Sequence, residues 1–239
     1  MNLLLFSAEE AKDPLPRSDP RAGHLLDVLR RQPGDTFDAG LVNGPRGRGT
    51  LVAIGAANLE LAFAWGEPPA PADPIIMVVG LPRPQTARDI LRDVTTLGIS
   101  ELHFVACEKS EASYARSALW TDGEWRRQVL AGAAQAFDTR VPEVRHGATL
   151  EETLALLPPA AARLALDNYE ATTLLSDCPL SREAVVVLAL GPERGWSAME
   201  RDLLRASGFT LAGLGPRVLR TETAAIAALT LVKATRGLL

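Results

Sequence analysis

Two glycine-containing segments of this 239-residue chain hold residues whose types and spacing suit the binding of a small ligand. The first, residues 190–195, reads Leu-Gly-Pro-Glu-Arg-Gly and follows an apolar run that predicts a buried strand. The second, residues 214–224, places a glycine, two arginines and a glutamate ahead of an apolar run that predicts a helix. Backbone amides and small residues from two such loops could cradle a flat, adenine-like ligand. Neither segment matches the dinucleotide fingerprint GxGxxG or a P-loop.

The charged residues of the second segment allow a chemical and a structural interpretation. Arg217 and Arg220 stand among aliphatic residues, where they could contact a ligand or form surface ion pairs. Thr221 is the predicted N-cap of the helix, and Glu222 in its first turn would complement the helix dipole. The first segment, taken alone, could also be an ordinary turn between a strand and a helix.

Alternating strands and helices must position these loops. Apolar runs predict strands at 75–79, 102–106, 164–166 and 185–190, and apolar stripes or capping signals predict helices at 86–97, 124–137, 198–208 and 224–232. Ser197 and Glu200 form a capping box at the start of the third of these helices. The alternation predicts an α/β domain with a mostly parallel sheet.

A proline-rich break divides the chain into two predicted domains. Residues 67–74 hold four prolines, which fix the backbone and remove hydrogen-bond donors, so we interpret 68–74 as a semi-rigid linker. Before it, residues 1–67 show short apolar pieces separated by turn signals, which predict a small β-barrel interrupted by one helical piece from His24 to Arg31. Residues 75–239 form the α/β domain.

A cluster of basic residues in the N-terminal domain could contact phosphate groups. Arg17, Arg21 and Arg30 flank His24 in the sequence. Solvated surface charge is the alternative for each arginine, and ordinary packing is the alternative for His24.

Composition excludes several classes of protein. Hydrophobic residues make up 47% and charged residues 23% of the chain, which excludes a disordered or fibrous protein. No apolar run approaches the roughly 18 residues that span a bilayer, and the apolar start is too short for a signal peptide, so we expect a cytoplasmic protein without membrane contact. Two lone cysteines fit a reducing compartment, and three scattered histidines lack metal-ligand spacing, so we expect no metal. The net charge of −4 argues against a strongly basic nucleic-acid binder, although local patches matter more than the sum.

The two glycine segments together resemble the signature of the RsmE family, SPOUT-class RNA methyltransferases that methylate N3 of a uridine in small-subunit ribosomal RNA. The motif Leu-Gly-Pro-Arg-Val-Leu-Arg-Thr-Glu-Thr-Ala at 214–224 matches at nearly every position. Shorter matches occur at 24–35, 108–110 and 140–143, so the resemblance covers most of the chain.

This resemblance implies a deep trefoil knot in the C-terminal domain, a PUA-like N-terminal barrel that binds RNA, and a homodimer formed through the C-terminal domain. It implies S-adenosyl-L-methionine as the cofactor and ribosomal RNA or the small ribosomal subunit as the partner. Arg194 and Arg217 join the N-terminal cluster as predicted RNA contacts. The predicted cofactor-binding residues are Leu190, Gly191, Pro192, Glu193, Gly195, Leu214, Gly215, Pro216, Val218, Leu219, Thr223 and Ala224.

The implied reaction assigns chemistry to two residues. A uridine N3 that accepts a methyl group must lose its proton, which leaves negative charge on the flanking carbonyl oxygens. Arg220 is the predicted catalytic cation that stabilises this charge. Glu222 is predicted to orient Arg220 or to accept the proton, and a helix-dipole role is its alternative.

The last predicted helix also bears on assembly, because it is apolar around most of its circumference. Homodimerisation would explain this pattern, and so would complete burial within one chain.

Five positions depart from the family pattern and keep other functions open. Arg194 stands where the family has glycine, and Asp93, Thr96, Ala134 and Asp138 replace residues in the part of the pattern that faces the substrate. The first interpretation is a uridine-N3 methyltransferase. The alternatives are a methyltransferase with a different RNA target and a catalytically weak RNA-binding paralogue.

Overall fold

The computed structural model describes residues 3–239, which divide into two compact units. One unit comprises the chain up to Pro71 together with Ala133–Val141, and the other comprises Ala72–Gly132 and Pro142–Leu239. Both glycine segments belong to the second unit, so its architecture decides whether they meet.

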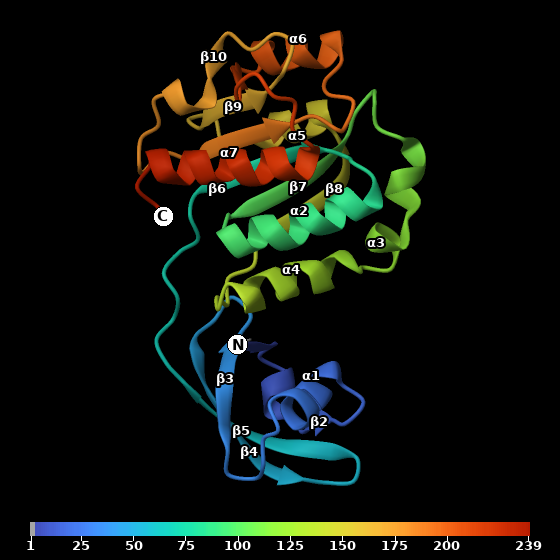
Figure 1. The fold of residues 1–239 in the computed structure, drawn as a ribbon, viewed down its shortest axis with the longest axis vertical. Helices are drawn as coiled ribbons and strands as arrows, with labels where there is room; N and C mark the ends of the chain where they lie inside the picture. The colour runs from blue at the N-terminus through green and yellow to red at the C-terminus, as the bar shows by residue number, and fades with distance from the viewer. Residues whose placement is uncertain (1–2) are drawn as a thin grey trace. The chain divides into compact units, whose positions relative to one another are not determined.

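A seven-stranded parallel sheet forms the centre of the second unit (Figure 1). Its order is β10-β12-β9-β11-β6-β7-β8, and all of its strand pairings are parallel. The strands are β6 (Ile75–Gly80), β7 (Glu101–Ala106), β8 (Glu143–Thr149), β9 (Ala162–Leu166), β10 (Thr173–Leu174), β11 (Val186–Leu190) and β12 (Thr210–Gly213). The predicted α/β fold with a mostly parallel sheet is therefore confirmed.

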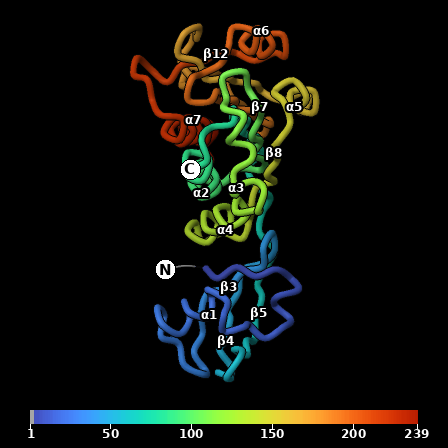
Figure 2. The backbone as a smooth tube through the Cα atoms, turned by 90° about the vertical axis from the view of Figure 1, so that its right-hand side faces the viewer, coloured from blue at the N-terminus to red at the C-terminus, as the bar shows by residue number. Residues whose placement is uncertain are grey.

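Helices cover both faces of this sheet, as Figure 2 shows. On one face α2 (Pro84–Leu97) packs against α7 (Thr221–Thr235), which also contacts β11. On the other face α5 (Leu150–Leu156) and α6 (Ala198–Ala206) pack their leucines against alternate residues of β6 and β11. Two further helices are α3 (Ala118–Thr121) and α4 (Trp125–Gln135). Because β11 is covered on both sides, all five of its residues are buried, which explains its uninterrupted apolar sequence.

The starts of α6 and α7 differ in how well local sequence predicts them. The capping box of α6 is confirmed: the Ser197 hydroxyl accepts the Glu200 backbone N–H at 3.2 Å, and the Glu200 carboxylate accepts the Ser197 N–H at 2.7 Å. The predicted N-cap of α7 is wrong. Arg220 occupies that position without a side-chain capping bond, because Thr221 is already the first helical residue and its side chain is buried.

The first unit contains a five-stranded sheet in the order β1-β3-β4-β5-β2. Its strands are β1 (Leu4–Phe6), β2 (Leu15–Pro16), β3 (Thr36–Leu41), β4 (Arg46–Ile54) and β5 (Asn58–Trp65). No pairing in the described chain joins the edge strands β1 and β2, so strand pairing does not close the expected barrel. The expected helix from His24 begins earlier, as α1 (Pro20–Gly23), and continues as one π-helical turn (His24–Val28).

Candidate functional site

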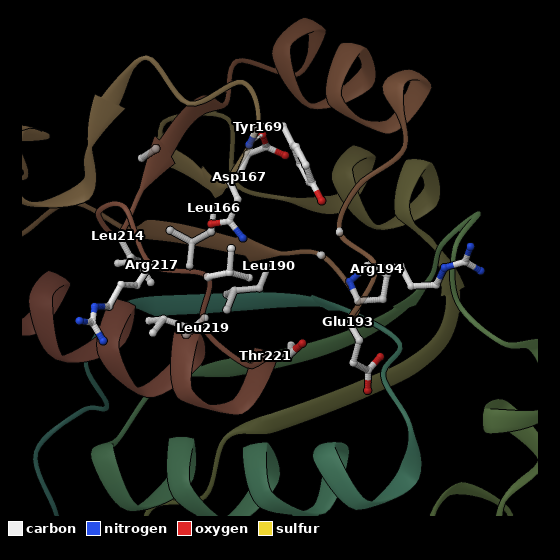
Figure 3. A pocket seen from close by; sticks show the side chains of 17 residues that line it. Leu166, Asp167, Tyr169, Leu190, Glu193, Arg194, Leu214, Arg217, Leu219 and Thr221 are labelled. Atoms are coloured by element: carbon white, nitrogen blue, oxygen red, sulfur yellow. Dashed lines mark hydrogen bonds between the residues drawn. The ribbon is translucent and has the colours of Figure 1, made fainter.

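The two glycine segments meet at one pocket at the carboxyl ends of β9, β11 and β12 (Figure 3). This edge is where ligands bind in open parallel sheets. Leu166 and Leu190 lie towards the middle of the pocket, whereas the guanidinium groups of Arg194 and Arg217 point away from it on opposite sides. The residues that line it are Leu166, Asp167, Asn168, Tyr169, Leu190, Gly191, Pro192, Glu193, Arg194, Gly195, Ala212, Leu214, Arg217, Val218, Leu219, Thr221 and Ala224.

The first loop leaves little space for a side chain at its start. A Cβ atom on Gly191 would lie 3.0 Å from backbone atoms of Gly195 and Trp196, so the loop closes on itself through this residue. Gly195 has a φ of +66°, a left-handed conformation that glycine adopts without strain. The two glycines therefore let the backbone of residues 191–195 turn tightly at the edge of the pocket.

Most of the predicted cofactor-binding residues line this pocket. Those that do are Leu190, Gly191, Pro192, Glu193, Gly195, Leu214, Val218, Leu219 and Ala224. Gly215, Pro216 and Thr223 are not among its lining residues in the described chain, although they belong to the same loop and helix start. Arg194 and Arg217, predicted as RNA contacts, lie at the pocket as exposed residues.

Sequence reasoning missed the segment that follows β9. Asp167 is buried, and its carboxylate accepts the backbone N–H groups of Tyr169 at 2.8 Å and Glu170 at 2.6 Å. The same carboxylate is paired with the buried Arg201 of α6 at 2.7 Å. Tyr169 is 76% exposed, and the Arg201 guanidinium lies 5.2 Å from its ring centroid. Two backbone hydrogen bonds and the ion pair with Arg201 therefore fix the turn that begins at Asp167, which lines the pocket.

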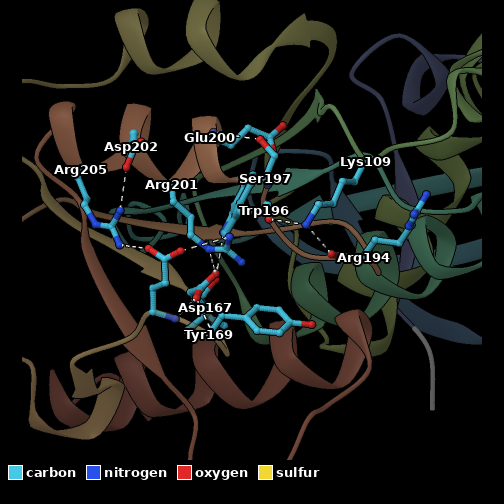
Figure 4. Close-up of polar contacts among 12 residues, drawn as sticks. Lys109, Asp167, Tyr169, Arg194, Trp196, Ser197, Glu200, Arg201, Asp202 and Arg205 are labelled. Carbon is cyan, nitrogen blue, oxygen red and sulfur yellow. Dashed lines mark hydrogen bonds and ion pairs between the residues drawn. The ribbon is translucent and has the colours of Figure 1, made fainter.

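A second set of polar contacts holds the loop after β11 (Figure 4). The Lys109 ammonium donates to the backbone carbonyl of Trp196 at 2.8 Å and to that of Arg194 at 3.4 Å. Glu200 accepts the backbone N–H of Glu108 at 2.8 Å in addition to its capping bond. The indole N–H of the buried Trp196 donates to the Leu166 carbonyl at 3.0 Å. These bonds join the loop to the segment after β7 and to the end of β9, which presents a preorganised backbone to a ligand.

The reactivity of Cys107, which follows β7, tests the packing around this loop. Burial raises the pKa of its thiol well above the usual range, and the nearby Glu200 carboxylate raises it further. Because the thiolate is the reactive form, we expect iodoacetamide to alkylate Cys107 in the folded protein at pH 8 far more slowly than in the denatured protein. Peptide mass spectrometry measures both rates, and equal rates would contradict this packing.

A second pocket adjoins the first and contains both predicted catalytic residues. It is lined by Arg83, Thr86, Glu193, Val218, Leu219, Arg220, Thr221 and Glu222. Glu193, Val218, Leu219 and Thr221 are shared with the first pocket. The side chains of Arg220 and Glu222 form no hydrogen bond or ion pair with each other or with another side chain in the described part of the protein. The predicted orientation of Arg220 by Glu222 is therefore not formed here.

The predicted RNA-contacting side chains of the first unit differ in whether they are exposed and free of ion pairs. Arg17 and Arg30 are exposed, and Arg30 carries no ion pair among residues 3–239. Arg21 forms ion pairs with Glu10 and Asp19, each at 2.7 Å, so its charge is already neutralised. The His24 Nε2 atom is buried without a hydrogen-bond partner.

Two further features are absent from the described residues. No group of three or more His, Cys, Asp or Glu side chains within residues 3–239 is arranged to hold a metal ion. No helix in that range has the length and apolar character needed to cross a membrane.

Comparison with known proteins gave matches in sequence and in fold. A family model described as an RNA methyltransferase domain matches residues 68–233. Ribosomal RNA small subunit methyltransferase E of Treponema pallidum is 35% identical over 243 residues, covering 98% of this chain and 91% of that protein.

Two solved structures share the fold. A protein of Porphyromonas gingivalis described as a probable rRNA methyltransferase superposes with a TM-score of 0.83, at 22% identity and 99% coverage of both chains. Ribosomal RNA small subunit methyltransferase E of Neisseria gonorrhoeae, bound to S-adenosyl methionine, superposes with a TM-score of 0.77, at 21% identity and with 98% and 97% of the two chains covered. At these identities the two structures establish the fold alone.

Proposed function

Because the chain belongs to the ribosomal RNA small subunit methyltransferase E family, we propose that it transfers a methyl group from S-adenosylmethionine to a base of small-subunit ribosomal RNA. The observation that carries this proposal is the convergence of residues 190–195 and 214–219 on one pocket. In this proposal the partner is ribosomal RNA or the small ribosomal subunit, and the protein acts in the cytoplasm.

The residues of the first pocket fit the methyl donor. Leu166, Leu190 and Leu219 offer an apolar surface to the faces of an adenosine, and the tight loop at Gly191 offers backbone groups without a side chain in the way. We assign Gly215, Pro216 and Thr223 the role of shaping the second loop. When bound, S-adenosylmethionine supplies an electrophilic methyl group on a sulfonium sulfur, which keeps the electron pair of the sulfur–carbon bond that breaks.

The acceptor in our proposal is N3 of a uridine, and Arg220 and Glu222 act on it. The nitrogen loses its proton and forms the new bond to the methyl carbon with its own electron pair. Arg220 stabilises the negative charge that spreads onto the base oxygens, and the Glu222 carboxylate takes the proton. Both residues line the second pocket, which shares a wall with the donor pocket.

The first unit supplies RNA contacts in this proposal. We assign it, over residues 1–67, a PUA-like fold joined through the 68–74 linker to a knotted domain over 75–239. Arg17 and Arg30, which are exposed, and Arg194 and Arg217 at the rim of the donor pocket are the phosphate contacts. Arg21 and His24 hold the structure of the first unit, since the first is neutralised and the second is partly buried.

We also propose a homodimer formed through α7. One face of this helix is buried in the unit, but Ile226 and Leu231 each remain 36% exposed, so the alternative of complete burial within one chain does not hold. Apolar side chains left on the surface of a helix are typical of an interface between subunits.

Ile226→Glu is therefore expected to convert the dimer into a monomer, because it places a charge in an apolar contact. Light scattering coupled to size-exclusion chromatography measures the mass. Met199→Glu on α6 is the matched control, since Met199 is 78% exposed on a different helix, and it should leave the dimer intact. An unchanged mass for Ile226→Glu would remove α7 from the interface.

Four departures from the family pattern have local partners outside the two pockets. Thr96 donates to the backbone carbonyls of Arg92 and Gly132, and Asp93 is paired with Arg92. Asp138 is paired with Arg140, and Ala134 packs in a small apolar cluster. None of the four is among the residues lining either pocket in the described chain. Because the four substitutions leave the lining of both pockets unchanged, we favour an active enzyme over a catalytically weak paralogue.

Modification mapping in a deletion strain tests the proposed function. Small-subunit ribosomal RNA from a strain lacking this gene should lose one N3-methyluridine, and the purified protein with S-adenosylmethionine should restore it. Loss of a different methylated base would keep the reaction and change the target. An unchanged modification pattern would contradict the proposal.

A further inference from the structure

The second pocket holds two guanidinium groups from different elements. Arg220 precedes α7, and Arg83 precedes α2, the helix that packs against α7. Both arginines line the pocket together with Glu222. Arg83 belongs to neither glycine segment, so the fold adds to the pocket a cation from a distant part of the chain.

Arg83 is anchored at two points. Its backbone N–H donates to the Glu193 carboxylate at 3.0 Å, which ties it to the loop after β11. Its Nε atom donates to the hydroxyl of the buried Thr86 at 3.0 Å. The two terminal nitrogens of the guanidinium have no partner among the described residues. The side chain is thus held at its Nε atom, while the donors on its two terminal nitrogens remain available.

The charges of this pocket match one kind of base. The Glu193 carboxylate already accepts the Arg83 backbone N–H, whereas the Glu222 carboxylate has no partner among the described residues and lines the same pocket as the two cations. An imide base such as uracil presents a carbonyl oxygen, an N–H and a second carbonyl oxygen along one edge. Two guanidinium donors and one carboxylate acceptor complement that edge, whereas the amino group of cytosine would meet a donor.

We propose that the second pocket is the binding site of the acceptor base, and that Arg83 and Arg220 each bind one of the two carbonyl oxygens that flank its N–H. This inference rests on the proposed function. The four residues shared with the donor pocket make the two ligands neighbours, and Val218, which is 80% exposed, offers an apolar contact to the face of the base. Arg83 selects an imide base and lowers the free energy of its deprotonated form.

The pH dependence of methyl transfer by Arg83→Ala tests this role. Loss of a cation beside the imide makes its proton harder to remove, so turnover at pH 7.5 should fall about 10- to 100-fold, the effect of one charge-assisted hydrogen bond. At pH 10, where the free base ionises by itself, the deficit should shrink to a few-fold. The turnover of Arg83→Lys, which keeps the charge, should lie between that of Arg83→Ala and that of the unsubstituted protein. Affinity for S-adenosylmethionine, measured by calorimetry, should be unchanged.

Arg116→Ala is the control, because Arg116 is an exposed arginine of the same unit that lines neither pocket in the described chain. Its turnover should equal that of the unsubstituted protein at every pH. An Arg83→Ala deficit of equal size at all pH values would assign Arg83 a structural role and overturn the inference, as would unchanged turnover. If the unsubstituted protein itself methylates no RNA, the proposed function fails, and this inference fails with it.

Discussion

Gly191→Val is expected to weaken the binding of S-adenosylmethionine by about 5- to 150-fold, the range that an overpacking cost of about 1–3 kcal/mol produces. A Cβ atom at this position would lie 3.0 Å from the Gly195 Cα and carbonyl carbon and from the Trp196 nitrogen. All three are backbone atoms, so the loop itself must move, and Lys109 and Glu200 hold it in place. Calorimetric titration measures the change in affinity.

A glycine with space around it provides the control. A Cβ atom on Gly213, at the end of β12, would meet its nearest neighbour at 3.6 Å, an ordinary contact distance. Gly213→Ala should therefore bind the cofactor like the unsubstituted protein, and Gly191→Ala should show a smaller loss than Gly191→Val. The thermal unfolding midpoint of each variant confirms that the protein is folded. Undiminished affinity in folded Gly191→Val would place the donor site elsewhere.

Arg220→Ala is expected to lower the rate of methyl transfer about 100- to 1000-fold, as the loss of a group that stabilises developing negative charge does in other enzymes. Arg220 lines the second pocket but not the first, so the affinity for S-adenosylmethionine should remain within about 2-fold, a change below 1 kcal/mol. Single-turnover transfer of a labelled methyl group to small-subunit RNA measures the rate, and calorimetry measures the affinity.

The separation of these two readouts makes the prediction specific. A variant that loses both affinity and rate would show that Arg220 shapes the donor pocket, and a variant that loses neither would remove Arg220 from the mechanism. Arg220→Lys keeps the charge without the forked donors and should recover part of the rate. Arg116→Ala again controls for the loss of one positive charge from the unit.

The fold of the second unit could be predicted where local signals were strong. The run from Val186 to Leu190 is buried on both faces, so its sequence has no polar interruption. β8 escaped prediction because most of its residues are exposed at the edge of the sheet. The start of α5 does have a local signal, because Thr149 and Glu152 form a capping box like that of α6.

The candidate site also contains some residues that the sequence could predict and others that it could not. The loops at Gly191 and Gly215 could be predicted because tight turns between strands and helices require particular residues. The position of Asp167 at the pocket could not be predicted, since it depends on an ion pair with Arg201, 34 positions later in the chain. Arg83 lies in a proline-bearing loop with no motif, and its significance comes from the packing of α2 against α7. Contacts between distant segments leave no local pattern.

A crystal structure of the protein with S-adenosylmethionine tests the central claim most directly. We predict density for the adenosyl group bordered by residues 190–195 on one side and 214–219 on the other, one molecule per chain. Density at any other place, or a complex in which side chains fill the space between these two loops, would contradict the account.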